Sequence, residues 1–144
     1  MTPTAQSLII CDSKTGSELA ISGYRMACWL HVDEAKFDKA PLLALHLAHI
    51  GVLHIAISGV EASFIHDEID DVLWKSGFEI STTWHEESLN EVAWDFLNVD
   101  FVSGGIALRC VIVLGKNFTE ELDRLSEITA HLSEASKSSV GSRG

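Results

Sequence analysis

The sequence predicts an α/β protein, a three-layer sandwich in which a mostly parallel sheet of about five strands carries helices on both faces. Two observations lead to this prediction. Apolar runs with the length of strands alternate along the chain with segments of helical periodicity, which is the pattern of a parallel sheet with crossover helices. Two of the runs, residues 27–32 and 106–114, are apolar at nearly every position, as expected for strands that are covered on both faces.

The other elements are predicted from periodicity and from turn and helix-stop residues. Residues 7–11 and 18–22 flank a turn at 12–16 and should form an N-terminal β-hairpin at one edge of the sheet. Further strands are predicted at 52–57 and 78–84, and helices at 39–50, 61–76, 88–98 and 119–132. Residues 1–132 should form a single α/β domain, and the Ser- and Gly-rich residues 133–144 a disordered tail.

Two Ser-x-x-Glu sequences mark predicted helix starts. In such a sequence the serine hydroxyl and the glutamate carboxylate satisfy backbone amides that have no partner within the helix. Ser58 and Glu61 mark the start of the helix at 61–76, and Ser88 and Glu91 mark the start of the helix at 88–98. Both serines are therefore interpreted as helix caps.

The charge of the chain is strongly negative and unevenly distributed. The net charge is −11, and residues 61–100 contain eleven acidic residues and a single lysine, which leaves only −1 for the rest of the chain. Such a surface repels nucleic acid and anionic membranes, and it attracts cations and basic proteins. We therefore expect a basic protein partner, with no nucleic acid and no membrane among the partners.

The cellular compartment is predicted from the lack of a membrane-spanning segment, a signal peptide and paired cysteines. No apolar run approaches the roughly 20 residues of a membrane-spanning helix, and residues 1–7 do not resemble a signal peptide. The three cysteines, Cys11, Cys28 and Cys110, form no C-x-x-C pair, and they are interpreted as small core residues rather than redox or zinc residues. We expect a cytoplasmic protein.

Two predicted helices carry aromatic residues away from their apolar stripes. Phe64, Asp67, Asp71 and Trp74 align on the helix at 61–76, and Trp94 lies among acids on the helix at 88–98. Both helices are expected to present these residues to the same outer surface, unless another element of the domain covers them. The predicted partner-binding residues are Phe64, Asp67, Asp70, Asp71, Trp74, Glu86, Glu87, Glu91, Trp94 and Asp95.

Chemistry, if present, is expected beyond the carboxyl ends of the strands, where sites form in open α/β sheets. Candidate catalytic residues there are His85, Glu86 and Ser58, with His85 and Glu86 as a possible general base pair. However, the sequence contains no G-x-G-x-x-G, no Walker A loop, no nucleophile elbow and no zinc-protease motif. Acids near His66 are interpreted as a solvated helix face. No catalytic residue, cofactor or metal site is therefore assigned.

A resemblance is carried by Thr82, Thr83, Trp84, His85, Glu86 and Glu87. With the helix that follows, this block is similar to a family of small bacterial α/β proteins that share the sequence T-T-W-H-E-(D/E) and have no assigned activity. The resemblance covers about the middle and C-terminal two-thirds of the chain and excludes the N-terminal segment. It implies a bacterial origin and an α/β fold, and it implies no activity.

The predicted function is that of a small acidic bacterial binding protein, specifically an immunity protein that neutralises a basic, nuclease-type toxin domain. Two alternatives stay open. The exposed aromatic residues could form a homo-oligomeric scaffold interface, or the chain could be a small hydrolase that uses His85 and Glu86 with Ser58.

Overall fold

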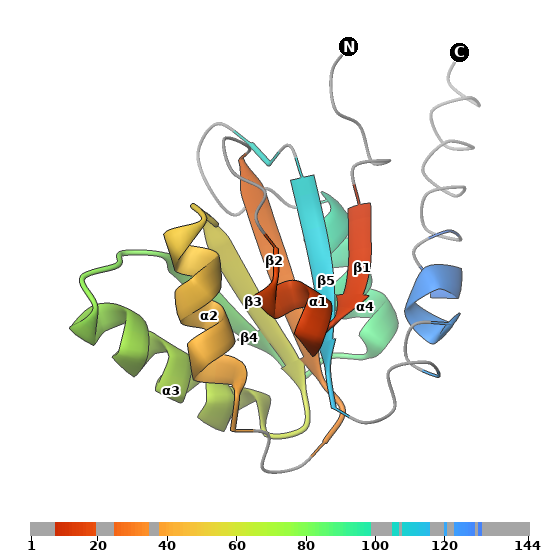
Figure 1. Ribbon diagram of the computed structural model, residues 1–144. Helices are drawn as coiled ribbons and strands as arrows, with labels where there is room; N and C mark the ends of the chain where they lie inside the picture. The colour runs from red at the N-terminus through yellow and green to blue at the C-terminus, as the bar shows by residue number, and fades with distance from the viewer. Residues whose placement is uncertain are drawn as a thin grey trace.

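A computed structural model describes residues 8–19, 25–34, 38–98, 105–106, 108–115, 120, 123–128 and 130 (Figure 1). Strands and helices alternate along these residues, as the sequence predicts. The strands are β1 (Leu8–Asp12), β2 (Met26–Val32), β3 (His54–Gly59), β4 (Ser81–His85) and β5 (Leu108–Leu114). The helices are α1 (Ser13–Ser17), α2 (Ala40–His49), α3 (Ala62–Lys75) and α4 (Leu89–Asn98), and residues 123–128 are also helical.

The five strands form one parallel sheet in the order β1-β5-β2-β3-β4. The apolar strands β2 and β5 lie inside it, and Cys28 pairs with Cys110 between them. Both strands are almost entirely buried, which confirms the interpretation of uninterrupted apolar runs as doubly covered strands. Cys11, Cys28 and Cys110 are free thiols buried in this sheet.

Helices cover both faces of the sheet, so the predicted three-layer architecture is confirmed (Figure 1). On one face, α2 and α3 pack against side chains such as Ile55 and Ile57. On the other face, Phe96 of α4 and Leu125 pack around Trp29 and Val111. Because α3 follows β3 on one face and α4 follows β4 on the opposite face, the chain changes side at the carboxyl ends of β3 and β4.

The prediction of an N-terminal hairpin with a turn at 12–16 is wrong, although β1 does lie at the edge of the sheet. Asp12 begins a short helix instead of a turn, because its carboxylate accepts a hydrogen bond from the Thr15 backbone amide at 2.8 Å. Gly16 is buried on α1, where its missing side chain leaves room for Ile112. Among the described residues, the edge strand β1 pairs with β5, in parallel, and with no returning strand. Of the second predicted hairpin strand, residues 18–19 are not in a strand and 20–22 lie outside the described residues.

The helix ends agree with the stop signals in the sequence. Pro41 lies in the first turn of α2, and Gly51 and Gly77 follow α2 and α3 with positive φ angles of 96° and 82°. The strand predicted at 78–84 begins later, since β4 runs from Ser81 to His85, and Phe78 and Ile80 pack against the core before it. The predicted helix at 119–132 is helical where it is described, and residues 133–144 lie outside the described residues.

None of the described helices combines the length and the apolar character needed to cross a bilayer.

Candidate functional site

The outer surface of α3 carries two exposed aromatic side chains beside carboxylates. Its buried stripe, which includes Ile65 and Ile69, turns the other side of the helix to solvent. Phe64 is 61% exposed and Trp74 is 76% exposed. Within the part of the chain that the structure describes, no other element covers these two rings, as the sequence predicted. We call Phe64, Asp67, Asp71 and Trp74 the α3 outer surface.

The ion pair on the exposed side of α3 joins two residues of the same helix. Asp71 lies 2.9 Å from the Lys75 ammonium, one helical turn away, and both side chains are exposed. Such a pair contributes little to stability because water screens it. Asp70 is directed toward the sheet, where it accepts a hydrogen bond from the Thr82 hydroxyl. Asp70 is therefore less available to a partner than Asp67 and Asp71 are.

The second predicted set of partner-binding residues lies at α4 and the segment before it. Trp94 is 51% exposed, and Glu86, Glu87 and Glu91 are also exposed. The expectation that α3 and α4 share one outer surface is wrong, because the two helices pack on opposite faces of the sheet. The ten predicted residues therefore form two separate surfaces.

A cavity of about 200 Å³ opens at the carboxyl ends of β2, β3 and β4, beside the start of α4. The predicted candidates Ser58, His85 and Glu86 all line it. The full lining is His31, Ser58, Gly59, His85, Glu86, Glu87, Leu89, Val92 and Arg124. The cavity lies where the chain changes from one face of the sheet to the other, which is the usual position of sites in open α/β sheets.

Ser58 is not a helix cap. It lies in β3, its side chain is buried, and Glu61 at the start of α3 has a left-handed conformation without a side-chain capping bond. Instead, the Ser58 hydroxyl accepts a 2.6 Å hydrogen bond from the indole nitrogen of Trp29. It also lies 2.9 Å from Nδ1 of His31. By contrast, Ser88 caps α4 as predicted, since its hydroxyl accepts from the Glu91 amide at 3.3 Å.

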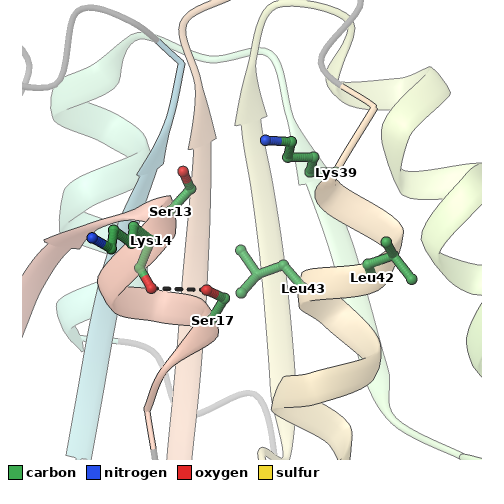
Figure 2. A pocket seen from close by; sticks show the side chains of 6 residues that line it. All are labelled: Ser13, Lys14, Ser17, Lys39, Leu42 and Leu43. Carbon is green, nitrogen blue, oxygen red and sulfur yellow. Dashed lines mark hydrogen bonds between the residues drawn. The ribbon is translucent and has the colours of Figure 1, made fainter.

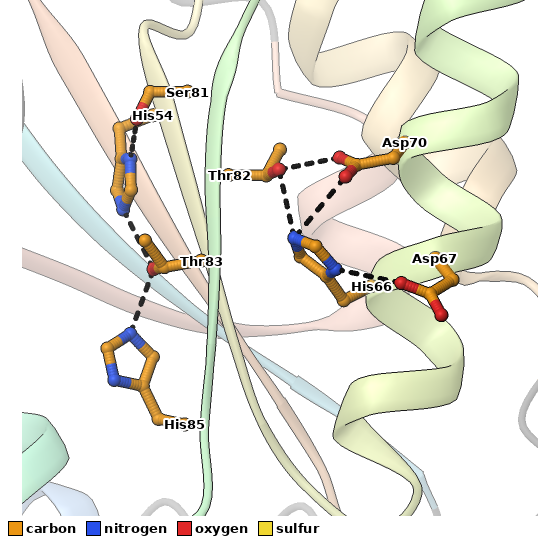
Figure 3. Close-up of polar contacts among 8 residues, drawn as sticks. All are labelled: His54, His66, Asp67, Asp70, Ser81, Thr82, Thr83 and His85. Atoms are coloured by element: carbon orange, nitrogen blue, oxygen red, sulfur yellow. Dashed lines mark hydrogen bonds and ion pairs between the residues drawn. The ribbon is translucent and has the colours of Figure 1, made fainter.

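His85 contacts Glu87 rather than the predicted partner Glu86. Its Nδ1 lies 3.3 Å from a carboxylate oxygen of Glu87, and its Nε2 lies 2.8 Å from the Thr83 hydroxyl. The Thr83 hydroxyl is also 3.2 Å from Nε2 of His54, whose Nδ1 lies 2.9 Å from the Ser81 hydroxyl (Figure 3). A chain of hydrogen-bonding groups therefore runs along the strands and ends at His85.

His54 is the buried end of this chain. Desolvation by burial, with a smaller contribution from the nearby charge of His85, lowers the pKa of His54 to about 4. His54 is consequently neutral at pH 7, and each of its ring nitrogens has a hydroxyl partner.

A second cavity lies between α1 and α2 (Figure 2). It measures about 410 Å³ and is lined by Ser13, Lys14, Ser17, Lys39, Leu42 and Leu43. Two lysines in a chain of net charge −11 make this surface locally basic. The sequence did not predict it, because the segment was interpreted as a hairpin turn.

We call the cavity at the carboxyl ends of β2, β3 and β4 the strand-end cavity. Several of its lining residues were not predicted from the sequence. His31 could have been found, since it follows Trp29 at the two-residue spacing that places side chains on one face of a strand. Arg124 comes from a helix far along the chain, and no local pattern connects it to the site.

No protein-family model, curated protein or solved structure matches the chain in comparisons of sequence and fold.

Proposed function

We propose that this protein is a binding protein that covers a basic surface of a partner protein, and that it acts as a bacterial immunity protein against a nuclease-type toxin domain. The observation that supports this best is the α3 outer surface, where Phe64 and Trp74 are 61% and 76% exposed within an acidic segment. Large exposed aromatic residues on a soluble protein are typical of contact surfaces.

The two kinds of side chain on this surface have different roles in binding. The Trp74 and Phe64 rings would supply area that loses water on contact, as anchor residues of interfaces do. Asp67 and Asp71 would attract a cationic partner over a distance and would pair with its basic side chains. A nuclease fits this description, because it needs a basic surface to bind phosphates, and carboxylates can occupy the same surface.

The experiment searches the reading frames beside this gene for a basic toxin domain and measures binding of that domain by calorimetry or surface plasmon resonance. We expect Phe64→Ser with Trp74→Ser to weaken binding at least about 100-fold, since each anchor contributes a factor of ten or more. The matched control is Trp94→Ser, which removes an exposed tryptophan from the opposite face of the sheet and should leave the affinity unchanged. The association rate should also fall steeply with added salt.

Three results would contradict this proposal. Equal binding by the double variant and the wild type would exclude the α3 outer surface, and loss of binding only in Trp94→Ser would assign the interface to α4. Light scattering that shows a stable homodimer, with Trp74 shielded from an aqueous quencher, would favour the homo-oligomeric scaffold instead.

A second candidate function is a small hydrolase, and the contact between Ser58 and His31 favours it. At 2.9 Å, Nδ1 of His31 can accept the Ser58 proton while the hydroxyl oxygen attacks a carbonyl carbon. The leaving alcohol would then take that proton, and water would release the acyl group from Ser58. A cavity of about 200 Å³ limits the acyl group to a small one.

The test is hydrolysis of p-nitrophenyl acetate by the wild type and two variants. Ser58→Ala and His31→Gln should each reduce turnover at least about 100-fold if Ser58 is the nucleophile. His66→Gln is the control, because His66 lies on α3 outside the cavity lining. Turnover that survives in Ser58→Ala would exclude this function.

A further inference from the structure

Three side chains beside the strand-end cavity direct metal-binding atoms to a common point. They are His85 at the end of β4, Glu87 in the segment that follows, and Asp95 on α4. One nitrogen or oxygen atom from each lies within 4.8 Å of the other two. His85 and Asp95 are only partly exposed, so the fold holds two of the three groups in place. We propose that His85, Glu87 and Asp95 bind a divalent transition-metal ion such as Zn²⁺ or Mn²⁺.

The distances fit an ion of this class. A zinc ion binds imidazole nitrogen and carboxylate oxygen at about 2.0 to 2.2 Å, so two ligand atoms of a tetrahedral ion are about 3.4 Å apart. The three atoms lie within 4.8 Å of one another, so binding an ion requires each pair to approach by at most about 1.4 Å, which side-chain rotations can supply. Imidazole together with carboxylates favours zinc, manganese or iron over magnesium and calcium, which prefer oxygen ligands alone.

A contact on the Nε2 side of the His85 ring orients Nδ1 for binding a metal ion. Its Nε2 faces the Thr83 hydroxyl at 2.8 Å (Figure 3). Its Nδ1 lies 3.3 Å from a carboxylate oxygen of Glu87. When Nδ1 binds an ion, Nε2 must carry the proton and donate it to Thr83. The Thr83 hydroxyl can then donate its own proton to neutral His54. Support of this kind is typical of metal-binding histidines, and it sets both the ring orientation and the tautomer.

A second histidine in the same chain shows that a histidine near two carboxylates does not by itself form a metal site. His66 also has two carboxylates nearby, with Asp67 at 3.3 Å and Asp70 at 3.4 Å. However, Asp67 faces Nδ1 and Asp70 faces Nε2, on opposite sides of the ring (Figure 3). These groups cannot bind one ion together with a single ring nitrogen. His66 is therefore a matched control for His85.

The cavity gives the ion room for further ligands. His85 and Glu87 both line it, and three protein ligands leave at least one position of a tetrahedral ion for water or a small ligand. This arrangement differs from a closed structural zinc site, in which the protein supplies all four ligands. The proposal is independent of the α3 outer surface, because the ion would lie between the strand ends and α4.

The test is calorimetric titration of the tag-free full chain with ZnCl₂, and separately with MnCl₂. We expect one ion per chain for the wild type. His85→Gln and Asp95→Asn should each weaken binding at least about 10-fold, whereas His66→Gln should leave it unchanged. Thr83→Val should weaken binding by a similar factor through His85, whereas Thr82→Val, which changes the hydroxyl next to His66, should not.

Circular dichroism of each variant confirms that the fold is retained. If His85→Gln or Asp95→Asn does not fold, Glu87→Gln replaces it, because Glu87 is exposed and glutamine has nearly the same size. Absence of one-to-one binding to the wild type would overturn the proposal. It would also be overturned by binding that His66→Gln weakens as much as His85→Gln does.

Discussion

Replacing Gly59 with alanine is expected to destabilise the protein by about 4 kcal/mol, which corresponds to a fall of about 15 °C in the melting temperature. Gly59 ends β3 with a φ angle of 96°, next to Val32 at the end of β2. A β-carbon built there would lie 2.0 Å from the Val32 carbonyl oxygen. That oxygen accepts a 2.8 Å hydrogen bond from the Val60 amide, so it cannot withdraw without breaking the bond.

Gly51→Ala is the matched control for this prediction. Gly51 has the same φ angle of 96°, and no heavy atom lies within 4 Å of the β-carbon position. Its replacement should cost only the backbone strain, about 1 to 2 kcal/mol. Chemical denaturation followed by circular dichroism measures both variants. Equal losses for the two would show that the contact with Val32 is relieved by a small shift of the strands.

The free energy of unfolding is expected to fall by about 3 kcal/mol as the pH falls from about 6.5 to about 4, because His54 takes up a proton when the protein unfolds. The folded protein holds the pKa of His54 at about 4, below the ordinary value of 6.5. In that window the unfolded chain binds a proton that the folded chain excludes, so protonation favours unfolding. The stability is fully present above pH 6.5 and is lost as the pH falls through the window. The groups around His54 include Ser81, Thr83 and the charge of His85.

His54→Gln isolates this contribution from that of the carboxylates, which also titrate in acid. The variant keeps a polar side chain beside Ser81 and Thr83 but cannot take up the proton. Urea denaturation at pH 7.0 and at pH 4.5 should show a smaller loss of unfolding free energy for His54→Gln than for the wild type. The same loss in both proteins would mean that His54 is not held neutral by the fold.

Much of the architecture could be predicted from local sequence, for identifiable reasons. The interior strands β2 and β5 are apolar at nearly every position, a pattern that is typical of strands covered on both faces. Glycines at 51 and 77 stop α2 and α3 because few other residues tolerate their φ angles. The exposure of Phe64 and Trp74 followed from their spacing relative to the apolar stripe of α3.

Errors arose where one local pattern is compatible with two structures. A polar segment such as 12–16 can be a hairpin turn or a short capped helix, and burial of Gly16 against Ile112 selects the helix. Similarly, Ser58 has the sequence context of a helix cap, but the tertiary structure buries it, and its hydroxyl accepts a hydrogen bond from the Trp29 indole nitrogen. Local hydrogen-bonding potential does not determine which partner a hydroxyl finds.

The sequence by itself determined the α/β class, the interior strands, most helix limits and the acidic, aromatic outer side of α3. These properties depend on the periodicity of side chains within one element, which is visible in a short window. Only the tertiary structure decided that α3 and α4 lie on opposite faces and that β1 pairs in parallel with β5. It also brought Asp95 to His85 and Ser58 to His31, because strand order and crossover direction set the distances between residues far apart in sequence.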